Sequence, residues 1–385
     1  MHVLRKKRFS TLETLGLVAL GAWCVQGIGH ALSVPGVAPG QVAKANDVQQ
    51  IVDAVTVLEE KLQFVQIVEG PLNGLAGPHM IVEGANLHVR SGAGSTDEDD
   101  CNGVGPACSG LGNLIVGYNE VDTIFTDLGK TGAHNLVVGT QHDFTRYGAL
   151  LAGRANNATG AYASVCGGFD NTASAFAAAV GGGIHNVASG QEASVSGGGD
   201  NVASGTAASI SGGVRGLASA SSSSVSGGLD NQATGGGASV LGGELNVADG
   251  SGAAVLGGNN NQATGDESTV CGGGANVASA IRSTVGGGIF NEASGQYTNV
   301  TGGRTNTASG AFAAVSGGES NQATGSYASV AGGRSNGASG DYATVLGGGG
   351  TEFLQGNLAS GDFATVVGDA NRVYRDIQSV GTLLH

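Results

Sequence analysis

A single 15-residue unit is repeated along more than half of this chain. Units start at Asn156, at Asn171 and at every fifteenth residue onward to Asn336, and a six-residue insert, 351–356, precedes one further unit at Asn357. A fixed period of this kind predicts a repeat architecture in which each unit stacks on its neighbours. We number the positions of the unit 1 to 15 from its asparagine and call one position across all units a column.

Several columns of the unit hardly vary. Column 1 is Asn except at Gly216, column 3 is always Ala, column 10 is Val except at Ile210, and columns 12 and 13 are Gly-Gly except in the last unit. Columns 8 and 10 are small or β-branched and alternate with columns 9 and 11, which is the period of a half-buried strand of four or five residues. Columns 1 to 4 predict a second short strand, and the glycines at columns 5, 12 and 13 predict two turns.

These features predict an all-β chain folded as a parallel β-solenoid of 15-residue coils. Successive coils are expected to stack about 4.8 Å apart, with the Asn side chains of column 1 in an internal ladder. A helix is excluded because a Gly pair in each unit would cost it about 2 kcal/mol relative to Ala. A flexible Gly/Ser linker would not keep Val in one column. Because the core of each coil is thin, we expect partner chains, and a homotrimer is the hypothesis.

The N-terminal residues 1–31 have the pattern of a signal peptide. A basic start is followed by an apolar core over 15–25 and by small residues at a cleavage point, with an uncleaved anchor as the alternative. The apolar run is short for a membrane span, which needs about 20 residues. We therefore expect export to the extracellular space or the cell surface of a bacterium, and no membrane span in the mature chain.

A linker over 32–46 leads to a predicted helix over 47–66. The apolar residues of this helix are spaced alternately by three and four, which is the a/d pattern of a coiled coil. The helix is either a short oligomerising coiled coil or an amphipathic helix packed on the end of the stack. The seam residues are Val48, Ile51, Val55, Leu58, Leu62 and Val65.

Both ends of the repeat array carry segments that depart from the unit. Residues 79–155 predict irregular first coils that cap the stack, with strands at 80–82 and 86–89. In the degenerate unit 141–155, Leu150 is expected to occupy the Val column. At the other end, the tail 372–385 is expected to fold over the last coil as a cap.

Four cysteines of the exported part fall into two pairs. Cys101 and Cys108 are close in sequence, and in an exported protein we expect them to form a disulfide. The acidic residues 97–100 beside them could bind Ca²⁺, although a solvated loop is favoured. Cys166 and Cys271 both fall in column 11, seven coils apart, which is too far for a disulfide within one chain.

The sequence contains no catalytic constellation, so we expect no enzyme, no metal and no cofactor. Its eight His residues are scattered without zinc-binding spacing, and its Gly-rich turns lack the Gly-Lys-Ser/Thr of a phosphate loop. The formal net charge of −14 argues against nucleic acid and anionic membranes as partners. Asp170, Asp200 and Asp230 fall at the unit boundary, but the nine-residue pattern of a calcium-binding β-roll is absent.

Column 7 carries aromatic side chains, and by the alternation of the strand it faces outward. One lies near the start, at Tyr162, and the others fall in the last five units, where we expect them to stack into an exposed stripe. The stripe either stiffens the rod by ring stacking or binds a sugar or a protein, and stiffening is favoured. The five stripe residues are Tyr297, Phe312, Tyr327, Tyr342 and Phe363.

Over about 113–371 the repeats resemble the heads of trimeric autotransporter adhesins. Those heads are left-handed parallel β-rolls with a short Ser-Val-Ala-Ile-Gly motif, and the segment 193–198, Ala-Ser-Val-Ser-Gly-Gly, has the corresponding place here. The resemblance implies left-handed coils and a homotrimer. Gly replaces the Ile of the motif, which we expect to thin the core. No long coiled stalk or membrane barrel follows the repeats, so anchoring by that route is not expected.

We therefore expect an exported, non-enzymatic rod that acts as an adhesin-like or structural module at the cell surface or outside the cell. Its expected partner is a host or matrix protein or a glycan. An ice-binding solenoid is the alternative, since column 4 is Ser or Thr in nearly every unit, although a regular Thr-x-Thr row is missing. A β-helical polysaccharide-binding or polysaccharide-processing protein is less favoured, because it would need longer coils and clustered carboxylates.

Overall fold

The computed structural model describes residues 45–97, 108–121, 128–349, 356–368 and 373–374. Contacts divide the chain into two compact units, Met1–His88 and Val89–His385, which we describe one at a time. The predicted signal peptide and nearly all of the predicted linker lie outside the described residues.

The first unit contains a helix and a pair of antiparallel strands. The helix α2, Ala45–Lys61, covers most of the predicted segment but ends before 66. Val65, predicted to be a seam residue, instead begins β1, Val65–Val68, which pairs antiparallel with β2, His79–Val82. The strand predicted at 80–82 therefore forms in a two-stranded sheet rather than in a coil, and the one predicted at 86–89 does not form. Among the described residues, no helix is long and apolar enough to cross a membrane.

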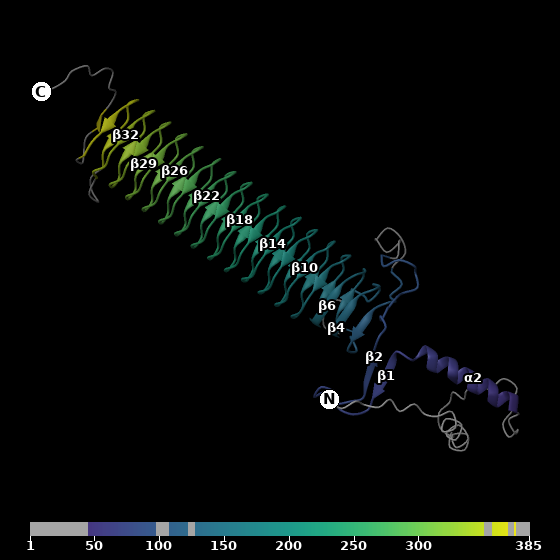
Figure 1. The fold of residues 1–385 in the computed structure, drawn as a ribbon. Helices are drawn as coiled ribbons and strands as arrows, with labels where there is room; N and C mark the ends of the chain where they lie inside the picture. Colours follow the sequence, from purple (N-terminus) through teal and green to yellow (C-terminus); the bar gives the residue numbers. More distant parts are fainter. Residues whose placement is uncertain (1–44, 98–107, 122–127, 350–355, 369–372, 375–385) are drawn as a thin grey trace. The chain divides into compact units, whose positions relative to one another are not determined.

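The second unit is a stack of coils in which each strand pairs in parallel with its counterpart one coil later (Figure 1). One sheet begins with β3, Leu114–Val116, β4, Leu136–Thr140, and β6, Leu150–Arg154, and continues through the even-numbered strands. The other begins with β5, Asp143–Phe144, and continues through the odd-numbered strands as a 16-stranded sheet. The parallel β-solenoid predicted from the 15-residue period is thus confirmed.

Within the repeats every strand has two residues. In the first sheet these are columns 9 and 10: β8 Ser164–Val165, β10 Ala179–Val180, β12 Ser194–Val195, β14 Ser209–Ile210, β16 Ser224–Val225, β18 Ser239–Val240, β20 Ala254–Val255, β22 Thr269–Val270, β24 Thr284–Val285, β26 Asn299–Val300, β28 Ala314–Val315, β30 Ser329–Val330, β32 Thr344–Val345 and β34 Thr365–Val366. In the second sheet they are columns 2 and 3: β7 Asn157–Ala158, β9 Thr172–Ala173, β11 Val187–Ala188, β13 Val202–Ala203, β15 Leu217–Ala218, β17 Gln232–Ala233, β19 Val247–Ala248, β21 Gln262–Ala263, β23 Val277–Ala278, β25 Glu292–Ala293, β27 Thr307–Ala308, β29 Gln322–Ala323, β31 Gly337–Ala338 and β33 Leu358–Ala359. The terminal strand β35, Val373–Tyr374, adds one further pair.

Each coil also has a third line of contact, which the sequence did not predict. Column 14 forms a single parallel bridge from coil to coil, as between Phe169 and Ile184. The strands are shorter than the predicted four or five residues because the chain turns at three places per coil. Columns 7 and 15 adopt positive φ, as at Tyr162 (57°) and Asp170 (52°), and column 13 does so through glycine. Two sheets and one row of bridges therefore surround the core.

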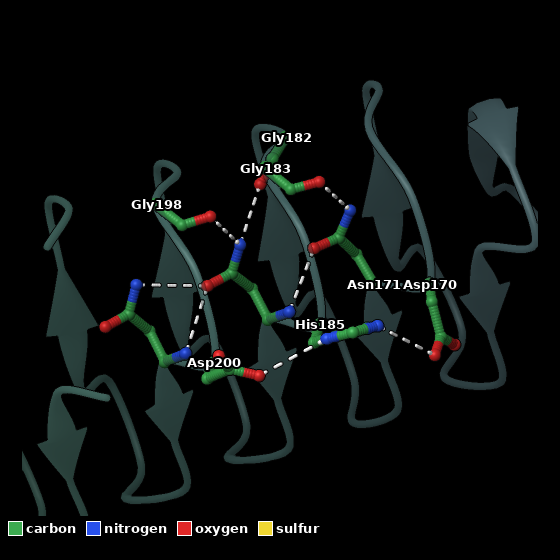
Figure 2. Close-up of polar contacts among 9 residues, drawn as sticks. Asp170, Asn171, Gly182, Gly183, His185, Gly198 and Asp200 are labelled. Carbon is green, nitrogen blue, oxygen red and sulfur yellow. Dashed lines mark hydrogen bonds and ion pairs between the residues drawn. The ribbon is translucent and has the colours of Figure 1, made fainter. Parts of the chain in front are cut away.

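The Asn ladder of column 1 forms, but it mainly joins side chains to backbone. Each Asn Oδ1 except that of Asn357 accepts the backbone N–H of the column 1 residue one coil on, as from Asn171 to Asn156 at 2.8 Å. Each Nδ2 donates to two glycine carbonyls of the turn, as from Asn186 to Gly182 and Gly198, both at 3.0 Å (Figure 2). The ladder thereby ties every coil to the next through the backbone.

The core is closed within a single chain. Columns 3 and 10 are 0 to 1% exposed throughout the repeats, and so are the Ala residues of column 8. Column 12, where Gly replaces the Ile of the adhesin motif, lies outside this core, since a Cβ added at Gly197 or Gly242 would meet nothing within 4 Å. The expectation that this Gly thins the core is therefore wrong. The chain has already turned outward after column 10, so the replacement removes apolar surface from the exterior.

The first coils keep the ladder with other residues. Leu151, not the predicted Leu150, occupies the Val column, because it pairs with Val165 and is fully buried. His142 occupies the Asn column: its Nδ1 accepts the Asn156 N–H at 3.2 Å, and its own N–H donates to Asn119 Oδ1 at 2.7 Å. The ladder therefore begins at Asn119, before the first 15-residue unit.

Acid is expected to loosen these first coils through His142. Burial lowers the pKa of His142 below its ordinary value, so the unfolded chain takes up a proton more readily than the folded one. The stability that the neutral His142 contributes is therefore full at pH values above the ordinary pKa of His, about 6.5. It falls as the pH drops through that value. Hydrogen exchange of the amides around Asn156, followed between pH 7.5 and 5, should show this loss. His142→Asn, which restores the usual ladder residue, should remove the pH dependence; an unchanged dependence would contradict the assignment.

Candidate functional site

The most distinctive surface feature is a rank of five aromatic rings along column 7. Consecutive rings are stacked with centroids 4.8 to 5.0 Å apart and planes within 1 to 4° of parallel. The side chains are 42 to 68% exposed. We call this feature the aromatic rank. It consists of Tyr297, Phe312, Tyr327, Tyr342 and Phe363.

Stacking decides which parts of these rings a ligand can reach. A flat ligand between two rings would need about 7 Å, twice the usual carbon–carbon contact distance of about 3.5 Å, and the spacing of 4.8 to 5.0 Å leaves no such room. Ring faces inside the rank are therefore covered by the neighbouring rings. The rank presents ring edges and the hydroxyls of Tyr297, Tyr327 and Tyr342 to the outside. This arrangement disfavours the face-on stacking by which sugars usually bind aromatic side chains.

The N-terminal end of the rank is closed by a charged pair in the same column. The Arg282 guanidinium lies over the Tyr297 ring, 5.6 Å from its centroid, where the negative face of the ring attracts it. Arg282 Nε also donates to Glu267 Oε2 at 2.6 Å. This bond holds the pKa of Glu267 below its ordinary value. Column 7 is thus ordered over seven successive coils, from Glu267 to Phe363.

Two carboxylates lie beside the rank in column 6. Asp341 accepts the Ser326 N–H and Asp362 accepts the Asp341 N–H, each at 3.0 Å. Both side chains are exposed and belong to the coils of Tyr342 and Phe363. The C-terminal part of the rank therefore combines ring edges, hydroxyls and negative charge, a set suited to hydrogen-bond donors on a partner.

Tyr162, the other column 7 aromatic, belongs to a separate cluster. It packs edge-to-face against Tyr147 at 5.2 Å and against Phe176 at 5.8 Å between ring centroids. Phe176 falls in column 6 and Tyr147 in the degenerate unit 141–155, so a search of column 7 within the repeats missed both. Comparing adjacent columns would have found Phe176, and extending the search to 141–155 would have found Tyr147.

Exposed charged side chains in the same column of successive coils also form ion pairs, which the sequence analysis did not predict. In column 15, His185 lies between Asp170 and Asp200, with nitrogen–oxygen distances of 3.6 and 3.3 Å (Figure 2). Two coils on, Arg215 makes two hydrogen bonds of 2.6 Å to Asp230. The hydrogen bonds from Arg215 hold the pKa of Asp230 below its ordinary value. From Asp170 to Asp230, acidic and basic residues alternate along this column, which explains the three boundary aspartates without calcium.

The remaining predicted sites are only partly covered by the structure. Cys101 and most of the acidic run 97–100 lie outside the described residues, so their disulfide and Ca²⁺ predictions stay predictions. Cys166 and Cys271 are free and exposed, as expected from their separation along the stack. Within the described ranges, no group of three or more His, Cys, Asp or Glu residues is placed to hold a metal ion.

Comparison with known proteins does not place the chain in a family. No protein-family model matches it, and no match was found among curated proteins.

Proposed function

We propose that the coil stack is an exported, non-enzymatic rod that acts as an adhesin-like or structural module outside the cell or at its surface. The observation that carries this proposal is the aromatic rank, an exposed row of stacked rings at fixed spacing on the coil stack. Isolated exposed apolar side chains are ordinary, whereas contiguous apolar patches mark interaction sites. The ligand class is a host or matrix protein or a glycan, held through ring edges and tyrosine hydroxyls.

Self-association is the second part of the proposal, and the helix α2 supports it. Leu58 of its apolar seam and Leu62, the residue that follows the helix, are about half exposed in the single chain, and a coiled coil of parallel copies would cover them. The left-handed coils and the homotrimer are implied by the resemblance that segment 193–198 carries, and the seam adds support for the homotrimer alone. Sedimentation of the mature chain tests the trimer, with Leu58→Ser and Leu62→Ser expected to dissociate it. A folded monomer at all concentrations would contradict the trimer hypothesis.

Replacing three tyrosines of the rank separates binding from stiffening. Tyr297→Ser, Tyr327→Ser and Tyr342→Ser together remove all four stacked contacts, each worth about 0.5–1.5 kcal/mol, so the melting temperature should fall. Binding to a glycan and matrix-protein array should be lost as well if the rank is the ligand site. Tyr162→Ser, outside the rank, is the matched control and should keep binding. Unchanged array binding with a lower melting temperature would assign the rank to stiffening alone.

Ice binding is the second candidate function. Column 4 presents Ser or Thr in nearly every coil, and the side chains at Ser189, Ser204 and Thr264 are exposed. Parallel stacking repeats this hydroxyl row at the coil spacing of about 4.8 Å. Thermal hysteresis of the purified protein separates the candidates, and its absence at high concentration would exclude ice binding.

A further inference from the structure

The outward face of the first sheet carries no charged residue. Columns 9 and 11 lie on either side of the inward-facing column 10, so both point away from the core. Neither column contains Asp, Glu, Lys, Arg or His anywhere from β3 to β34. The outward columns 2 and 4 of the second sheet, in contrast, include the exposed Glu292 and Asp249. We call columns 9 and 11 of the first sheet the neutral face.

Large apolar side chains are exposed at the start, in the middle and near the end of the neutral face. In each of these three groups they come from consecutive coils, and they are 36 to 69% exposed. The side chains are Leu114, Val116, Leu136 and Val138 at the start, Leu241 and Leu256 in the middle, and Leu346 and Val367 near the end. Contiguous apolar patches mark interaction sites, whereas single exposed apolar side chains are ordinary.

A second copy of this chain is the occupant that suits such a face. The formal net charge is −14, and a contact that brings like charges together costs several kcal/mol. Two copies related by a rotation axis parallel to the stack place each coil beside the same coil of the other copy. Each apolar group then meets its counterpart, and the neutral face brings no charge between the copies.

The neutral face is large enough for a stable contact. At about 4.8 Å per coil it is roughly 75 Å long from β3 to β34, and its two columns lie about 7 Å apart. With the width of the side chains, this gives roughly 700 Å² per copy, close to the about 800 Å² per partner of a standard protein interface. Its Ser and Thr side chains between the apolar groups match the polar share of such interfaces.

We propose that copies of this chain associate side by side and in register through the neutral face. This association rests on the self-association proposed above and extends it from α2 to the coil stack. Because α2 precedes the stack in every copy, the seams of two copies meet only when the copies run in the same direction. Cys166 and Cys271 are exposed in column 11 of this face, so in-register copies place each cysteine near its own counterpart.

Thiol crosslinking of the mature chain tests the register. A short bismaleimide joins two cysteines by adding one thiol to each of its double bonds, so the reaction needs no oxidant. In-register copies should give Cys166–Cys166 and Cys271–Cys271 links, which peptide mass spectrometry identifies, and no Cys166–Cys271 link. A Cys166–Cys271 link would overturn the proposal. The absence of links in a chain that sedimentation shows to be associated would overturn it as well.

A charge placed on the neutral face tests the contact itself. Ser211→Glu puts a carboxylate in column 11, beside the same carboxylate of the second copy, so association should weaken at least about 10-fold and both crosslinks should decline. Ser204→Glu adds the same charge to the same coil in column 4 and is the matched control, which should leave association and crosslinks unchanged. Both serines are exposed, so both variants should fold. Equal association of the two variants would overturn the proposal.

The helix variants separate this contact from self-association itself. If Leu58→Ser and Leu62→Ser dissociate the chain while Ser211→Glu does not weaken association, α2 alone joins the copies and the neutral face is excluded. A chain that sediments as a monomer at all concentrations excludes both contacts. Weaker association in Ser211→Glu and in the helix variants, but not in Ser204→Glu, supports both.

Discussion

Gly243→Ala is expected to disrupt the middle of the stack, while the same substitution at the adjacent Gly242 leaves it intact. Gly243, in column 13, has a φ of +86°, and a Cβ there would meet the Gly258 carbonyl oxygen at 2.1 Å and Asn246 Nδ2 at 2.6 Å. Neither group can move away, because the first is backbone of the next coil and the second is held in the ladder. We expect a loss of more than about 4 kcal/mol, the range reserved for disrupted cores and strained backbone.

Gly242 provides an internal control one residue away. A Cβ added there would meet nothing within 4 Å, so the change should stay within about 0.5 kcal/mol, as at ordinary surface positions. Chemical unfolding gives the free energies, and limited proteolysis shows whether Gly243→Ala is cut near coil 246–260. Equal effects of the two substitutions would mean that columns 12 and 13 do not have the roles described above.

The period of the sequence was enough to predict the stack, because a 15-residue repeat with Val and Ala in fixed columns has few other ways to bury them. The lengths of the strands were not predictable, since they depend on which residues take positive φ. Column 15 does so with Asp170, His185 and Arg215, none of which marks a turn as glycine does. Leu150 and Leu151 illustrate the same limit: both are apolar, and only the pairing with Val165 selects Leu151.

The candidate site was likewise predictable from the sequence only in part. The aromatic stripe followed from the period, because residues 15 apart must lie above one another in stacked coils. Which surface of each ring is free did not follow, since it depends on the ring spacing and on Arg282 lying over Tyr297. The cluster around Tyr162 was missed because two of its rings come from other columns or from the irregular unit. The N-terminal segment had too few heptads to show where the helix ends and β1 begins.

Asn246→Ala is expected to cost about as much as removing a large core side chain, although it removes only polar atoms. The amide of Asn246 donates to the carbonyls of Gly242 and Gly258, both at 2.9 Å, and its Oδ1 accepts the Asn261 N–H at 3.0 Å. Alanine deletes these three bonds and leaves the N–H of the buried Asn261 without a partner, while the Gly258 carbonyl keeps the Glu244 N–H at 2.9 Å. At about 1–3 kcal/mol for the unpaired buried N–H and about 0.5–1.5 kcal/mol for each of the other two lost bonds, the free energy of unfolding should fall by roughly 3–5 kcal/mol. Asn259→Ala, at an exposed column 14 position, is the control and should change stability little.

Asn246→Asp tests the direction of these bonds. The carboxylate has the size of the amide but turns the two donated bonds into contacts between a negative charge and carbonyl oxygens. At neutral pH it should therefore be less stable than Asn246→Ala, since an unpaired charge costs more to bury than a missing amide. Burial raises the pKa of this new carboxyl in the folded state above its ordinary value of about 3.9, so the folded chain binds the proton first. The stability of the variant should then rise as the pH falls toward that value, opposite to the effect at His142. Urea unfolding at several pH values measures both trends, and a carboxylate tolerated at neutral pH would show that the ladder does not depend on Nδ2 as a donor.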